Sequence, residues 1–181
     1  MTDDGKPLIA AYDYVWQRFT DRLTGLSDPE YFWEPVTGCW SLRQDRRGRW
    51  RLDGAGGGGR APAPVPVTTI AWRIGHVVGL GLAGFADRLF EEGTLAPDTV
   101  EYPATVDGLP AFLAEHYEAW RAGLVSLDED GWRRPLGPAW GPYAESSTMD
   151  LALHVFDEVV HHGGEVGVLR DLYQHRSDLR R

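Results

Sequence analysis

The chain has 181 residues, of which 27 are acidic and 18 basic, giving a net charge of -9. This length suits a single domain over residues 1–181, and the lack of a dense basic run argues against sequence-independent nucleic-acid binding. Cys39 is the only cysteine, so an intrachain disulfide is excluded, and neither a signal-like start nor an apolar run of about 20 residues is seen. We therefore expect a cytoplasmic protein that is not bound to a membrane.

Two amphipathic helices are predicted in the first half of the chain. Apolar residues recur three and four positions apart over residues 7–26, as on one face of a helix. A second such pattern begins at Thr68 or Thr69, either of which can cap a helix, and reaches about Glu92, where Gly93 stops it.

The segment between these helices does not show helical periodicity. Within residues 31–53, apolar side chains lie on both sides of a charged Arg46-Arg47-Gly48 turn, which predicts a short hairpin. Residues 54–66 follow and are rich in glycine and proline. They have few core-forming side chains, so we predict a mobile loop there.

Two further helices are predicted in the second half. The third follows Asp107 as its cap, has Pro110 in its first turn and runs to Leu127. The fourth opens within residues 146–148 and continues beyond Arg170. Four amphipathic helices without βαβ alternation predict an all-α protein, a four-helix bundle with a long irregular insertion between its first two helices.

The last helix carries polar residues in an otherwise apolar pattern. His154, Glu158 and His162 follow one another at four-residue steps, and each step turns about 40° around a helix. Imidazole and carboxylate are ligands that zinc, nickel or ferrous iron accept. A further ligand has to come from another helix, and His76 on the second helix is the candidate.

Other interpretations of these histidines remain open. His76 alone is as compatible with a hydrogen-bonded core residue as with a ligand. The rotation of about 80° from His154 to His162 strains three-way convergence, which favours His154 as a lining or supporting residue. His161 points about 60° away from Glu158, and we expect it at the surface or in helix packing.

The second helix contains four glycines, and each costs roughly 1 kcal/mol relative to alanine inside a helix. They are Gly75, Gly79, Gly81 and Gly84. Close approach of a neighbouring helix or of a ligand would explain them, and a weak helix is the alternative.

Tryptophan and arginine side chains add two less specific predictions. Tryptophans in the irregular segments either wall a pocket at the metal-bearing end or cover the end of the bundle; they are Trp33, Trp40, Trp50, Trp132 and Trp140. Arginines near the site helices either clamp a carboxylate of a ligand or lie on helix surfaces; they are Arg73, Arg88 and Arg170.

Two segments resemble the DinB-like superfamily, which includes thiol-dependent transferases and mycothiol-dependent maleylpyruvate isomerases. They are TTIAWRIGHVVG on the second helix and LALHVFDEVVHHGGEVGVLRDLY on the last, and the resemblance covers most of residues 8–173. It implies a four-helix bundle with a divalent metal held at one end by His76, Glu158 and His162. Many members have histidine where Glu158 stands, whereas the mycothiol-dependent branch resembles this chain in having glutamate.

The resemblance implies chemistry on a small-molecule thiol such as mycothiol. Zinc is the first candidate for the metal, with nickel, iron and manganese as alternatives. A metal-bound thiol loses its proton and becomes a nucleophile near neutral pH, so transfer to an electrophilic substrate or isomerisation is expected. The sequence identifies no general acid or base and no thiol-binding residue, and Cys39 is not needed.

Two other functional classes fit the same residues. The protein is then either a non-catalytic binding or stress-response module with a structural metal or none, or a helical interaction protein that forms a homodimer through an apolar helix face. An open coordination position that faces a cavity would favour the enzyme, whereas a saturated, buried site would favour the module.

Overall fold

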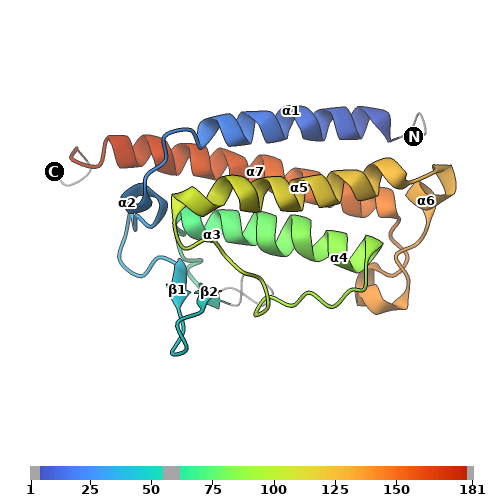
Figure 1. Cartoon of the computed structure of the whole chain (residues 1–181), viewed down its shortest axis with the longest axis horizontal. Helices are drawn as coiled ribbons and strands as arrows, with labels where there is room; N and C mark the ends of the chain where they lie inside the picture. Colours follow the sequence, from blue (N-terminus) through green and yellow to red (C-terminus); the bar gives the residue numbers. More distant parts are fainter. Residues whose placement is uncertain (1–4, 55–61, 179–181) are drawn as a thin grey trace.

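Four long helical segments lie side by side in the computed structural model, which describes residues 5–54 and 62–178 (Figure 1). Three are α-helices: α1 (Lys6–Arg22), α5 (Leu109–Ser126) and α7 (Thr148–Gln174). The fourth, here called the composite helix, joins α3 (Ile70–Ile74), the π-helix η2 (Gly75–Ala83) and α4 (Gly84–Phe90). The predicted all-α bundle is confirmed, whereas the π-helical part was not predicted from the sequence.

Each long segment contacts two others around the bundle. Helix α1 packs on α7 and α5, and η2 packs on the other sides of α5 and α7. The composite helix and α5 run in the same direction, so the chain between them, residues 91–108, returns along the whole bundle (Figure 1). We call residues 91–108 the crossing segment; it ends in the 3₁₀-helix η3 (Val106–Gly108).

Most predicted helix ends agree with the structure. The Thr69 side chain caps α3 by accepting a hydrogen bond from the Trp72 backbone N–H. Ser147 caps α7 in a capping box with Asp150, which satisfies backbone N–H groups at both residues. Asp107 differs from the prediction, because it lies within η3 and Gly108 takes the N-cap position of α5.

The bundle shares a core that is rich in aromatic side chains. The Trp16 ring of α1 stacks on Tyr117 of α5 with centroids 4.4 Å apart. The buried Tyr12 hydroxyl donates to the Ala152 carbonyl of α7 over 2.6 Å. These contacts bind three helices together. Among the described residues, the helices are all too short or too polar to cross a bilayer.

The predicted hairpin is present and is attached to the composite helix. Strands β1 (Leu42–Gln44) and β2 (Trp50–Leu52) pair antiparallel, with Leu42 opposite Leu52. The Trp72 indole N–H donates to the Asp53 carbonyl just after β2, over 2.9 Å. The predicted mobile loop falls largely on residues 55–61, which lie outside the described residues.

Short helices complete the two ends of the bundle. Helix α2 (Asp28–Tyr31) follows α1, while α6 (Glu129–Arg133) and the 3₁₀-helix η4 (Pro138–Tyr143) precede α7. The hairpin and η4 lie at opposite ends of the composite helix (Figure 1). The two irregular segments therefore flank the bundle rather than gathering at one end.

Two of the four glycines in the composite helix are explained by close approach. A Cβ atom would lie 2.7 Å from the Leu52 side chain at Gly75, and 2.9 Å from the Tyr102 ring at Gly79. The approaching groups come from β2 and the crossing segment rather than from a neighbouring helix. Gly81 and Gly84 are not crowded in this way and need a different explanation.

Arg170 forms a buried ion pair instead of a ligand clamp or a surface group. Its Nε lies 2.8 Å from Glu30 Oε1, and both side chains are buried. Its Nη1 also donates to the Thr24 carbonyl over 2.9 Å. The pair therefore connects the end of α7 to α2 and to the turn after α1.

Removing one charge of this pair should destabilise the fold. Glu30→Gln leaves the buried Arg170 charge uncompensated, and we expect a loss of about 3 kcal/mol in the free energy of unfolding. Asp171→Asn is the matched control, because its pair with Arg22 is exposed and should contribute less than about 1 kcal/mol. Urea unfolding measures both, and equal small losses would contradict a structural role for the buried pair.

Candidate metal centre

Three side chains from two helices meet as the sequence predicted. His76 lies on η2, and Glu158 and His162 lie one turn apart on α7. Glu158 Oε2 is 3.3 Å from His76 Nε2 and 3.3 Å from His162 Nε2. All three donor atoms lie within 4.8 Å of one another, so this group could hold a metal ion.

The spacing of these atoms fits a tetrahedral divalent ion. Ligand atoms that lie 2.0–2.1 Å from such an ion are about 3.3 Å apart. The two separations from Glu158 match that value. Two imidazoles and one carboxylate also leave a net charge of about +1 on a divalent site, with a fourth position for another ligand.

The hairpin holds the His76 ring in place through Trp72. The rings of Trp72 and His76 stack with centroids 4.9 Å apart and planes 16° apart. Trp72 in turn donates to the Asp53 carbonyl and packs against Trp40, with centroids 5.7 Å apart. The π-helix adds a local cause, because its wider turns shift the side chains that follow and often occur at functional sites.

Glu165 and Arg73 hold the other side of the His162 ring. The Glu165 carboxylate contacts His162 Nδ1, and Arg73 Nε lies 2.9 Å from Glu165 Oε2. When Nδ1–H donates to Glu165, the lone pair of Nε2 faces Glu158 and His76, as a metal ligand requires. Sequence reasoning missed Glu165, although its position three residues after His162 places it on the same helix face.

Burial and neighbouring charges set the ionisation of this pair. Burial lowers the pKa of His162, and the positive charge of Arg73 lowers it further despite the contact with Glu165. Burial raises the pKa of Glu165, but the hydrogen bond from His162 and the Arg73 charge outweigh it and leave that pKa below its usual value. At neutral pH, His162 is thus a neutral imidazole and Glu165 a carboxylate.

The three candidate ligands face a cavity of about 690 Å³, here called the metal-centre cavity. His76 and Glu158 remain 23% and 31% exposed. Gly81 and Gly84 line the same cavity, and a side chain at Gly84 would meet no other part of the described structure within 4 Å beyond its chain neighbours and the backbone of its own helix. These two glycines therefore leave space for a guest instead of accommodating a packed neighbour.

The other candidate residues lie outside the three-residue group, and His154 and His161 lie where their rotation around the helix predicted. His154 is exposed and lines the metal-centre cavity beside the three-residue group. His161 is exposed, with its Nε2 3.3 Å from Glu165 Oε1. Asp157 has two interpretations from the sequence, orienting an imidazole or lying on a solvated helix face, and in the structure it is exposed on α7. Cys39 is buried, and burial raises the pKa of its thiol, which keeps it protonated.

The tryptophans of the irregular segments are divided among several places. Trp40 reaches the site through Trp72, and Trp140 lies on Phe85 at the opposite end of the composite helix. The remaining three pack elsewhere: Trp33 on Tyr173, Trp50 on Phe32, and Trp132, buried within α6, against Gly5. None of the five is among the lining residues of the metal-centre cavity, so the structure does not support the interpretation that they wall a pocket at the metal end.

Comparison with known proteins identifies a family over most of the chain. Residues 11–166 match the family model of the DinB superfamily. This span includes His76, Glu158 and His162, and a divalent metal is typical of that superfamily. No match was found among curated proteins or among solved structures.

Glu165 should influence metal affinity although it lies outside the group of His76, Glu158 and His162; it forms a second possible metal-binding group with His161 and His162. In Glu165→Ala, Arg73 is left to donate to His162 Nδ1, which favours the tautomer with its proton on the metal-facing Nε2. We expect zinc or cobalt affinity to fall roughly 10- to 100-fold. Competition with a chromogenic chelator measures this. Asp157→Asn is the exposed control and should bind as the unmodified chain does; an unchanged affinity in Glu165→Ala would contradict the orienting role.

Proposed function

Because the chain belongs to the DinB superfamily, we propose that it is a divalent-metal-dependent enzyme that activates a small-molecule thiol for transfer or isomerisation. The observation that supports this proposal best is the orientation of His76, Glu158 and His162 toward a shared cavity. Three protein donors with an open position are typical of catalytic zinc sites, whereas structural sites have four protein ligands.

A bound divalent ion would lower the pKa of a coordinating thiol, so that the thiolate attacks an electrophile near neutral pH. The residues of this chain have separate roles in that chemistry. Glu158 reduces the charge of the site by one unit relative to a three-histidine site. Glu165 and Trp72 orient the two imidazoles, through the Nδ1 contact and the stacked ring.

The metal-centre cavity has the size of a small-molecule site. Its volume of about 690 Å³ lies within the range of roughly 300–1,000 Å³ that ligand pockets occupy. Part of its wall is the crossing segment, including Pro97 and Val100, and another part is the glycine surface of the composite helix. A binding module with a saturated structural ion is the weaker proposal, because such an ion would not face an open cavity.

Metal loading tests the ligand assignment. Protein incubated with zinc or cobalt and then dialysed should retain about one ion per chain, whereas His162→Ala should lose it because one of three donors is gone. His161→Ala is the neighbouring control and should retain the ion, since its ring is exposed and does not belong to the group of His76, Glu158 and His162. Equally negligible metal in all three proteins, measured by elemental analysis, would remove the foundation of the proposed function.

Thiol binding tests the catalytic part of the proposal. Cobalt-loaded protein should develop a thiolate-to-cobalt charge-transfer absorption when mycothiol is added. In Gly84→Leu, the new side chain should fill the cavity and suppress that band, while cobalt remains bound. Gly164→Leu is the matched control, because Gly164 is exposed on α7 and open to solvent. A thiol band of equal strength in both variants would show that the thiol does not enter this cavity.

A further inference from the structure

A second cavity of about 530 Å³ adjoins the metal-centre cavity at the far end of the composite helix. Phe85, Arg88 and His154 line both cavities, so the two are neighbours across a common boundary. Leu136 and Trp140 form the outer wall of the second cavity. We call this space the Trp140 cavity.

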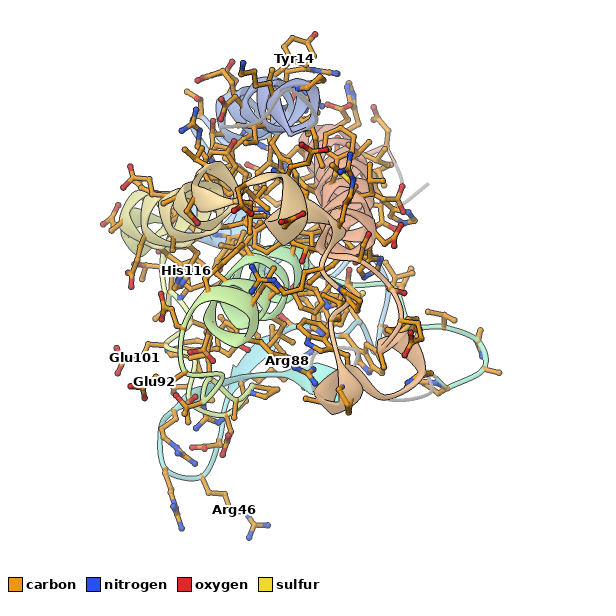
Figure 2. All side chains as sticks on the ribbon, turned by 90° about the vertical axis from the view of Figure 1, so that its right-hand side faces the viewer. Tyr14, Arg46, Arg88, Glu92, Glu101 and His116 are labelled. Atoms are coloured by element: carbon orange, nitrogen blue, oxygen red, sulfur yellow. The ribbon has the colours of Figure 1, made fainter. Side chains whose placement is uncertain are left out.

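Arg88 and Phe85 fix the position of the Trp140 ring. The Trp140 ring stacks on Phe85 with centroids 6.0 Å apart and planes 24° apart. The Arg88 guanidinium lies 4.0 Å from the centre of the indole ring and donates to the Ala139 carbonyl. Figure 2 shows the Arg88 side chain beside the segment that precedes α7. Since this charge is engaged with η4, Arg88 acts here as a support for the indole.

The charged Asp150 side chain on the remaining wall is also engaged in interactions within the protein. The Asp150 carboxylate lines the Trp140 cavity, but its Oδ2 accepts hydrogen bonds from the Ser147 N–H, over 2.8 Å, and from the Ser147 hydroxyl. These bonds lower the pKa of Asp150 and belong to the cap of α7. The groups left facing the space are largely apolar and aromatic, as in a pocket for an apolar ligand group.

We propose that the Trp140 cavity binds an apolar ring of the electrophilic substrate, while the reactive end of the same molecule lies at His76, Glu158 and His162. This inference rests on the proposed function, because it places one small molecule across both cavities. The shared boundary supports it, because only side chains separate the two cavities there. The Phe85 and His154 rings lie at this boundary with centroids 6.1 Å apart, so a ligand that reaches both cavities has to pass these two rings. The substrate class is then an electrophile with an aromatic or similarly bulky apolar group.

Hydroxamates separate binding at the metal from binding in the Trp140 cavity. A hydroxamate chelates a divalent ion, so acetohydroxamate tests the metal position alone and phenylacetohydroxamate adds a ring. With zinc-loaded protein, we expect the phenyl compound to bind about tenfold more tightly, because its ring is removed from water. Isothermal titration measures both affinities.

Two variants with opposite effects on volume locate the ring. Trp140→Ala removes the aromatic wall and Ser146→Phe fills the cavity, and each should abolish the tenfold preference while acetohydroxamate binds as before. Trp33→Ala is the matched tryptophan control, because Trp33 packs on Tyr173 instead of lining this cavity. It should retain the preference.

Each outcome has a distinct meaning. Equal affinities of the two hydroxamates, or a preference that survives in both cavity variants, would overturn the inference and leave the proposed function standing. If neither compound binds zinc-loaded protein, the metal has no coordination position open to a ligand, which contradicts both the proposed function and this inference. A lower melting temperature of Trp140→Ala with unchanged affinities would show that Trp140 only covers the end of the bundle.

Discussion

The packing of α7 against the π-helical part of the composite helix is the contact on which the site depends. It brings His76 to Glu158 and His162, whose separation in the chain is large, and it leaves their nitrogen and oxygen atoms 3.3 Å apart. Neither helix holds its histidine alone. The hairpin braces His76 through Trp72, and the Arg73–Glu165 pair braces His162, so the centre combines contributions from the bundle and from the insertion.

The helices and the grouping of Glu158 with His162 could be predicted because their signals are local. Repeats of three and four residues identify helical faces, and the Glu158 to His162 spacing places both side chains on one face. Glu165 was missed because a glutamate on a helix is usually solvated, and only the tertiary position of Arg73 shows that it holds an imidazole. The π-helix was missed because its apolar pattern in this segment is the same as that of an α-helix.

The four glycines of the composite helix could be noticed in the sequence but explained only from the structure. From the sequence, all four had the same two explanations. In the structure, the Leu52 side chain packs closely against Gly75 and the Tyr102 ring against Gly79, whereas Gly81 and Gly84 line the cavity beside the candidate ligands. The reason for a glycine therefore differs between neighbouring positions on one helix. Sequence periodicity cannot distinguish these reasons, because they depend on side chains from other segments.

The parallel run of the composite helix and α5 has an evolutionary consequence. Residues 91–108 have to run back along the bundle, and part of that segment lines the metal-centre cavity, whereas His76, Glu158 and His162 lie on the composite helix and α7. Substitutions at Leu95 or Pro97 would therefore change the wall of the cavity and leave His76, Glu158 and His162 in place. The shape of the cavity and the arrangement of these three side chains can therefore change independently of each other during evolution.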